Sequence, residues 1–163
     1  MEPVADNNTL NVLVERFGAA IIACGKDKGD LVAIVDKKRI HDIVAFLRDE
    51  PTLDFNMLID LFGVDYLPRT PRFEVVYHLH CLQRNERLRL RVQLEEKDCE
   101  LDSVTDLYPV ADWLERETWD MFGIMFKGHP NLKRLLMYDS FKGHPLRRDY
   151  PINKRQPLIG PRN

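Results

Sequence analysis

The segments FEVVYHLHC (residues 73–81) and LRLRVQL (residues 88–94) decide the fold of this chain. In each segment the apolar residues recur at every second position, which is the period of a β-strand with one buried face. The polar residues 83–86 between them predict a tight turn. We therefore expect a β-hairpin, and the arginines of the second segment mark its other face as facing solvent or a partner.

Shorter patterns upstream of the hairpin extend this prediction. Apolar residues at helical spacing predict one helix that begins at a cap at Asn8 or Thr9 and a second that begins at Asp36 and ends at Pro51. Three short apolar runs predict further strands, at residues 19–24, 31–35 and 55–61. The order α-β-β-α-β-β-β predicts a two-layer α+β domain over residues 1–102, with two helices on a mostly antiparallel mixed sheet and a charged loop at its end.

A different segment, residues 103–126, follows this domain and predicts a third helix. Ser103 and Asp106 form a capping pair, Pro109 suits a first helical turn, and Gly123 suits a helix C-cap. Large apolar residues fall on two sides of the helix: Val110, Trp113, Leu114 and Met121 on one, Trp119 and Phe122 on the other. A helix buried on two sides needs a second cover, either the chain's own tail or a neighbouring protein.

Glu117 falls in the middle of the first apolar side of this helix, where an unpaired carboxylate is costly. It acts either as a general acid or base with a raised pKa, or as a structural carboxylate that caps or bridges the tail. We favour the structural role. Arg116 and Asp120 have the spacing of an i,i+4 ion pair on a neighbouring side.

The last part of the chain, residues 127–163, is basic and follows an internal repeat. FKGHP at residues 126–130 recurs at residues 141–145, and half of the ten prolines lie in this part, which excludes long helices. Nine Lys and Arg against two Asp give it a balance of +7, which leaves −9 for the first 126 residues. Its leucines and aromatic residues make it too apolar for a disordered linker. We therefore expect an extended docking arm that becomes ordered on another surface.

The composition limits the chemistry that the chain supports. Three cysteines without a C-x-x-C pair suit a reducing compartment and cannot supply the usual four-thiolate ligand set of an iron–sulfur cluster. No apolar run approaches the roughly 18 residues that span a bilayer. The start Met1-Glu2-Pro3 lacks the features of a signal peptide. We therefore expect a cytoplasmic chain that holds no cluster and does not span a membrane.

Two other classes of function match single features of the sequence. His78 and His80 share a strand face and could bind zinc together with a carboxylate, but no second ligand pair accompanies them. The basic tail with its aromatic residues has the ingredients of a nucleic-acid-binding module, but it follows an acidic body. We consider both weaker than a protein-docking role, and so expect no metal site and no nucleic-acid partner.

The run WLERETWDMFGI (residues 113–124), with its E-R-E-x-x-D core, resembles the signature of the C subunit of bacterial NADH–quinone oxidoreductase, respiratory complex I. The segments GHP (128–130), RLL (134–136) and GHPLRRDYP (143–151) continue the same pattern, and shorter similarities lie at residues 63–66 and 72–77. The resemblance covers most of the chain beyond about residue 50, whereas the N-terminal third agrees only in element order.

The resemblance implies a non-catalytic, structural subunit of the peripheral arm. Its partners in complex I would be the D and B subunits, which form the quinone pocket, and the ferredoxin-like I subunit. Flavin and iron–sulfur clusters would belong to these and other neighbours, and the chain would lie on the cytoplasmic face of the bacterial inner membrane. Equivalent subunits of F420H2 or quinone dehydrogenases and of membrane-bound hydrogenases are the alternative. The interface residues that we expect are Glu115, Arg116, Glu117, Trp119, Asp120, Phe122, Gly123, His129, Pro130, Arg134, Leu135, Leu136, Phe141, His144, Pro145, Arg147, Arg148 and Asp149.

Overall fold

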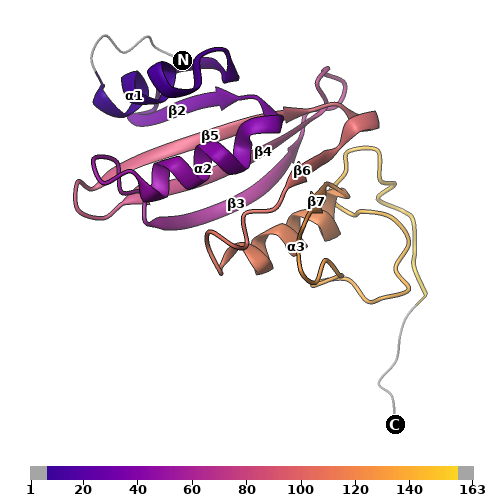
Figure 1. The fold of residues 1–163 in the computed structure, drawn as a ribbon. Helices are drawn as coiled ribbons and strands as arrows, with labels where there is room; N and C mark the ends of the chain where they lie inside the picture. The colour runs from indigo at the N-terminus through magenta and orange to yellow at the C-terminus, as the bar shows by residue number, and fades with distance from the viewer. Residues whose placement is uncertain (1–6, 158–163) are drawn as a thin grey trace.

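A five-stranded mixed sheet with strand order β1-β2-β5-β4-β3 is the main layer of the structure (Figure 1). Its strands are β1 (Ile21–Asp27), β2 (Asp30–Val35), β3 (Met57–Asp65), β4 (Phe73–Cys81) and β5 (Glu86–Leu94). All neighbouring strands are antiparallel except β2 and β5, which run parallel. The computed structural model describes residues 7–157, so the start Met1-Glu2-Pro3 and the arm's residues 158–163 lie outside the described part.

The hairpin of β4 and β5 is confirmed in the register that the alternation predicts. Tyr77 lies opposite Leu90 and Val75 opposite Val92, and all four side chains are fully buried. On the other side of β4, Leu61 of β3 pairs with Tyr77 and extends the same buried face. The α+β fold class is therefore confirmed, with the predicted strand order along the chain.

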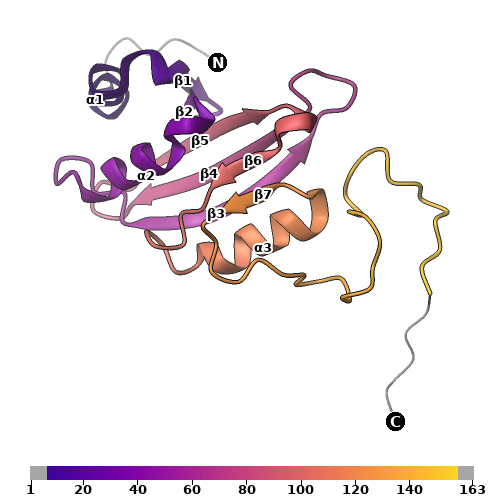
Figure 2. The ribbon, with the colours of Figure 1, turned by 45° about the vertical axis from the view of Figure 1, so that its right-hand side comes forward.

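Three helices cover one face of this sheet (Figure 2): α1 (Asn8–Phe17), α2 (Ile40–Asp49) and α3 (Ala111–Phe122). The predicted α2 stripe is fully buried and consists of Ile40, Ile43, Val44 and Leu47. Burial of each such side chain contributes about 1.5–3 kcal/mol, so this stripe anchors α2 on the sheet. Short 3-10 turns adjoin these elements at Gly18–Ala20, Lys37–Arg39 and Glu96–Asp98.

Several element boundaries differ from the prediction, one of them because of a polar cap. Asn7 caps α1, since its side chain accepts the N–H of Leu10, so the predicted cap at Asn8 or Thr9 is wrong by at least one residue. The strand expected at residues 55–61 runs from Met57 to Asp65. The segment expected as a charged loop contains a short strand, β6 (Glu100–Asp102).

Strand β6 pairs in parallel with β7 (Met125–Lys127), which follows α3. Leu101 of β6 and Phe126 of β7 are buried in the same core as the main sheet, together with Ile124. The pair of strands thus fixes both ends of residues 103–126 to the body.

The opposite face of the main sheet is not covered by a helix within residues 7–157 (Figure 2). Arg91 of β5 donates two hydrogen bonds to the carboxylate of Glu74, and Arg89 pairs with Asp30 and with His78. The prediction that these arginines face away from the core is confirmed. Two ion pairs, Arg91 with Glu74 and Arg89 with Asp30, therefore lie on this face.

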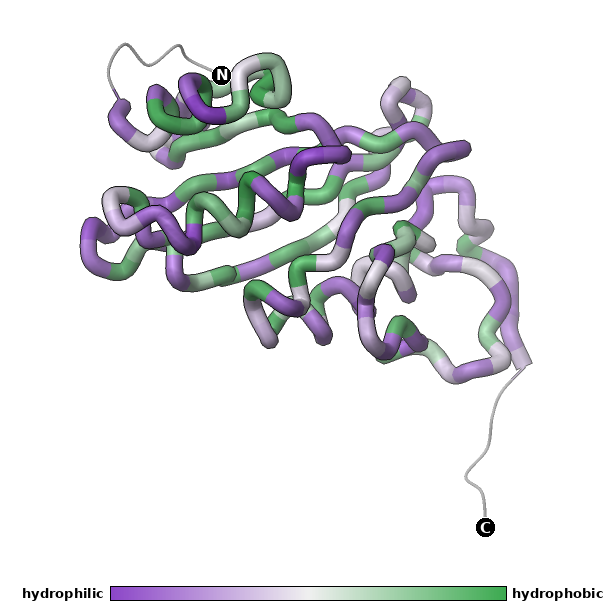
Figure 3. The backbone as a smooth tube through the Cα atoms, in the orientation of Figure 1, coloured by the Kyte–Doolittle hydropathy of each residue, from purple (hydrophilic) through white to green (hydrophobic). Residues whose placement is uncertain are grey.

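After β7, the described part of the arm runs to residue 157 without a helix or strand and curves around the C-terminal end of α3 (Figure 1). Short hydrophobic stretches alternate with hydrophilic ones along it (Figure 3). This pattern fits a segment that packs at some points and is solvated at others.

Candidate docking interface between helix α3 and the arm

Helix α3 is the platform of the candidate site because it packs closely against β3. A Cβ atom at Gly63 of β3 would lie 2.9 Å from Cδ2 of Phe122 and 3.2 Å from Cγ2 of Thr118. Protein interiors have no room for such an atom without a shift of the neighbours. The absence of a side chain at Gly63 therefore sets the distance between α3 and the sheet.

Asp120 is the main polar anchor between α3 and the arm. Its side chain is fully buried, and its Oδ2 accepts the N–H groups of Leu135, Leu136 and Met137 at 2.9–3.0 Å. Arg134 donates to its Oδ1 at 2.6 Å. Burial alone would raise the pKa of Asp120, but these N–H groups and the guanidinium outweigh it and hold the pKa below its usual value. Asp120 is thus a buried, ionised carboxylate that folds residues 134–137 around itself.

Arg116 is the second anchor, and it does not pair with Asp120 as the i,i+4 spacing predicts. Its guanidinium donates to the backbone oxygens of Lys133 and Arg134, both at 3.1 Å, and lies over the ring of Trp113. The predicted i,i+4 pair is wrong because both side chains bind the arm instead of each other.

The arm also satisfies the last carbonyl groups of α3, which have no partner inside the helix. His144 Nδ1 lies 3.0 Å from the backbone oxygen of Asp120, the N–H of Leu146 donates to that of Met121, and Arg147 donates to that of Phe122. Since a carbonyl only accepts, His144 must carry its proton on Nδ1. The arm therefore acts as a C-terminal cap of α3.

Gly123, the predicted C-cap, is confirmed in the left-handed conformation with φ of 77°. A Cβ there would lie 2.6 Å from the ring of His144 and 2.8 Å from the guanidinium of Arg147. Glycine is needed both for the backbone conformation and for the approach of the arm.

The two FKGHP repeats perform the same task at opposite ends of α3. In both repeats the glycine has a positive φ, 81° at Gly128 and 102° at Gly143. His129 Nε2 lies 3.2 Å from the backbone oxygen of Asp112 in the first turn, and His144 binds that of Asp120 in the last. Each repeat therefore turns the chain and fixes it to one end of the helix.

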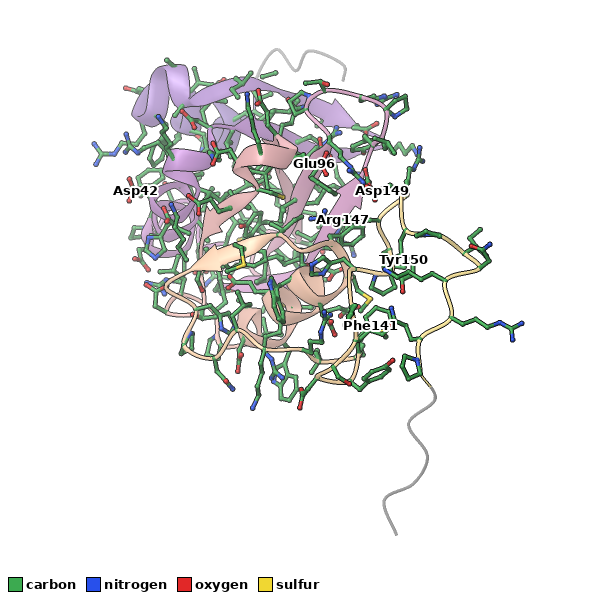
Figure 4. The ribbon with its side chains drawn as sticks, turned by 90° about the vertical axis from the view of Figure 1, so that its right-hand side faces the viewer. Asp42, Glu96, Phe141, Arg147, Asp149 and Tyr150 are labelled. Carbon is green, nitrogen blue, oxygen red and sulfur yellow. The ribbon has the colours of Figure 1, made fainter. Side chains whose placement is uncertain are left out.

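A third anchor, centred on Arg72, joins the arm to the sheet, and Figure 4 labels two of its partners, Glu96 and Asp149. Arg72 is almost fully buried and donates two hydrogen bonds to Asp65, two to Asp149 of the arm and one to Glu96, at 2.7–3.0 Å. The backbone N–H of Arg148 donates to Asp65 as well. Burial raises the pKa of Asp65, but Arg72 and the two backbone N–H groups outweigh it and lower the pKa to about 2.

The buried glutamate of α3 is Glu115, whereas the expected burial of Glu117 is wrong. Glu117 is exposed, as are Val110 and Trp113 on its side of the helix. Glu115 is fully buried and accepts hydrogen bonds from Ser103 Oγ at 2.7 Å and from the N–H of Val104 at 2.8 Å. Ser103 therefore binds Glu115, and the predicted capping pair of Ser103 and Asp106 is also wrong.

Burial raises the pKa of Glu115 to about 7, and the two hydrogen bonds only partly oppose this effect. Because the pKa is raised in the folded chain, Glu115 contributes full stability below its unfolded value of 4.5, and this contribution is lost as the pH rises through 7. Glu115→Gln should remove this dependence on pH. At pH 8 the free energy of unfolding of the variant should therefore exceed that of the wild type by up to about 3 kcal/mol. Urea unfolding between pH 5 and 8 measures it, with Glu117→Gln as the control on the same helix. Parallel profiles for Glu115→Gln and wild type would contradict the assignment.

The other predicted site residues differ in their burial and in their contacts. Trp119 lies half-buried against the ring of His144, and Phe141 stacks on Tyr150 and meets Tyr138 edge-on (Figure 4). Leu135, Pro145 and Phe122 are half-buried, while Pro130, Leu136 and Glu117 are exposed and make no polar side-chain contact with α3 or the sheet. The exposed residues are therefore free to contact a partner.

Arg72, Asp65 and Ser103 were not predicted as site residues. Asp65 and Arg72 lie where β3 ends and just before β4 begins, so a charged residue there is ordinary in a sequence. Only the return of Asp149, 77 positions later, shows that Arg72 is an anchor. The local sequence gives one indication of this role: Arg72 directly precedes β4, in which apolar residues alternate.

Within residues 7–157, no group of three or more His, Cys, Asp or Glu side chains is placed to hold a metal ion. His78 accepts a hydrogen bond from Arg89, and His80 lies within hydrogen-bond distance of Asn85. Among the same residues, no helix combines the length and apolar character needed to cross a membrane.

Comparison with known proteins identifies the class of protein to which this chain belongs. Residues 33–156 match the family described as respiratory-chain NADH dehydrogenase, 30 Kd subunit. The chain is 47% identical to the C subunit of NADH-quinone oxidoreductase from Citrifermentans bemidjiense over 160 residues, 96% of this chain and 98% of that one. It is also 47% identical to the corresponding C subunit of a Roseiflexus species, over 93% of this chain and 87% of the relative.

Two solved structures share the fold. A trypsin-resistant fragment (1-134) of Nqo5 has a TM-score of 0.65 and 36% identity, and the match covers 76% of this chain and 98% of the fragment. A chain of the membrane-bound sulfane sulfur reductase, an archaeal respiratory membrane complex, has a TM-score of 0.73 at 20% identity, over 88% of this chain and 84% of that one. The family match shows that the chain is a subunit of a respiratory-chain NADH dehydrogenase. More particularly, the chain belongs to the family of C subunits of NADH-quinone oxidoreductase, complex I.

Proposed function

We propose that the chain is a non-catalytic, structural subunit of the peripheral arm of a bacterial proton-translocating NADH–quinone oxidoreductase. The observation that carries this proposal is 47% identity over 98% of a relative named as the C subunit of that enzyme. The polar groups of the candidate site also support a structural role. Asp120, Arg116 and Arg72 all make their hydrogen bonds with the chain's own backbone or charged side chains, as positioning groups do.

The proposal assigns the redox groups to neighbouring subunits. The chain's three cysteines cannot supply the four thiolates that an iron–sulfur cluster usually needs. Flavin and the clusters then belong to partners, and the isolated chain has no NADH-oxidising activity. Its neighbours would be the D and B subunits, which it supports around the quinone site, and the I subunit, on the cytoplasmic face of the inner membrane.

Within this proposal the chain divides into the α+β domain (1–102), the signature helix and turn (103–126) and the docking arm (127–163). The arm's +7 balance suits contact with acidic surfaces of other subunits, and Leu136 and Leu146 expose apolar surface along it. The Nqo5 fragment, described as trypsin-resistant, matches 76% of this chain.

Purification of a tagged chain from native membranes tests this function. After a wash at high salt, we expect the other subunits of an NADH–quinone oxidoreductase, flavin and iron to be retained in constant ratio. Nucleic-acid contacts weaken steeply with salt and would be lost. Recovery of nucleic acid instead of protein subunits, or of the chain alone, would contradict the proposal. Recovery with subunits of a hydrogenase or an F420H2 dehydrogenase would assign it to the related complexes.

A further inference from the structure

A groove lies between β3 and α3 and is completed by Leu146 of the arm. It encloses a cavity of about 220 Å³. Its lining includes Asp60, Phe62 and Gly63 from β3, Glu117 and Phe122 from α3, and Leu146 from the arm. The hydrogen bond from the N–H of Leu146 to the backbone oxygen of Met121, 3.1 Å long, holds the arm's contribution in place. The groove is therefore complete only when the arm is bound to α3.

The charged side chains that line this groove are both acidic. Asp60 is partly exposed, and its Oδ1 accepts only the N–H of the next residue, Leu61. Glu117 is exposed, and neither carboxylate has a basic partner among residues 7–157. Two unpaired acids on opposite walls of a groove favour a cation between them.

Apolar surface surrounds these two acids. Phe62 is 38% exposed and Leu146 is 56% exposed, on two walls of the groove. Met57 and Ile59 of β3 are also exposed, and so is Trp113 of α3, which is 57% exposed one turn before Glu117. Exposed aromatic and aliphatic side chains around a charged pair are the composition of a protein-binding surface.

We propose that this groove binds a segment of a neighbouring subunit in which a lysine or arginine stands beside an apolar residue. The apolar side chain enters between Phe62 and Leu146, and the cation lies between Asp60 and Glu117. This inference rests on the proposed function, because it assumes that the chain is assembled with other subunits. It gives Glu117 an intermolecular role in place of the internal one that the helical pattern indicates.

A second copy of this chain is a poor occupant, although its arm is basic. Asp120 and Arg72 hold that arm on its own body, and Arg134 and Arg147 already bind acceptors there. These two arginines are therefore already occupied, and we take a chain of another kind as the source of the cation, with a second copy as an outcome of the test. A neighbour with a free basic segment meets both the charge and the apolar requirements.

Charge reversal in the assembled complex tests the proposal. Glu117→Lys should lower recovery of the chain with the complex about tenfold, and Glu117→Gln less, because like charges placed together cost more than a lost attraction. Glu15→Lys, on the exposed side of α1, is the control and should assemble as the wild type does. Equal recovery of all three variants, with unfolding temperatures like that of the wild type, would overturn the proposal.

Photo-cross-linking gives an independent readout in the otherwise intact complex. A benzophenone amino acid at Phe62 should cross-link to a peptide of another subunit that contains Lys or Arg beside an apolar residue. The same probe at Leu82, exposed at the turn after β4, should not reach that peptide. Cross-links to lipid only, to an acidic peptide or to a second copy of this chain would each overturn it. If the wild-type chain brings down no other subunit, the proposed function itself fails; if it does and these probes fail, only the groove is wrong.

Discussion

A chain that ends after Lys127 is expected to fold but to be lost from the purified complex, with incorporation reduced at least about tenfold. This cut keeps β7 and its buried Phe126 while it removes the whole arm. Asp120 and Arg116 lose their partners, but they become exposed to water at the same time, so neither is left buried and unpaired. A cut after Gly123 would be a poorer experiment, because it also removes β7 and the buried Ile124.

The matched control for this truncation is a chain that ends after Pro157, which retains the Asp120 and Arg72 anchors. Thermal unfolding of both truncated chains verifies that the body is folded, and the yield of each in tag-purified complex measures docking. Full incorporation of the chain that ends after Lys127, with normal NADH–quinone activity, would show that the arm is dispensable. The body would then be the docking surface.

Arg72→Met is expected to cost about 3–5 kcal/mol of folding stability, the usual effect of removing one partner from a buried ion pair. The substitution leaves the buried carboxylate of Asp65 without its main donor and releases Asp149 of the arm. Urea unfolding measures the loss. Arg87→Met, the same change at an exposed position on β5, should shift stability by no more than about 0.5 kcal/mol.

A second substitution separates the cost of the orphaned charge from the loss of packing. Asp65→Asn combined with Arg72→Met should be more stable than Arg72→Met alone, because no buried carboxylate remains unpaired. A double variant that is less stable than the single one, with additive losses, would mean that Asp65 and Arg72 do not act as a pair.

The parts of the fold that depend on local period were predictable. The β4–β5 hairpin and the buried stripe of α2 follow from alternation and from helical spacing, and both packed as expected. Strand ends and caps were less accurate, since a single side chain such as Asn7 decides them. The family signature at residues 113–124 was readable because it is long and particular.

The contacts of the candidate site could not be predicted from the sequence. In α3 the polar side chains Glu115, Arg116 and Asp120 are buried while Trp113 is exposed. The spacing of apolar residues alone predicts the reverse. It does not reveal the hydrogen-bond partners that a distant turn or the arm provides for the polar side chains. Arg72 illustrates the same limit, since its partners lie 7, 24 and 77 positions away.

The carboxylate of Asp120 also implies a direction in time. The three N–H groups that it binds lie 15 to 17 positions later in the chain, so during translation the acceptor is made before its donors. Domains generally fold as units, and the N-terminal ones fold first during synthesis. Helix α3 can therefore already be packed on β3 when residues 134–137 leave the ribosome, so that the arm binds to a body that is already folded.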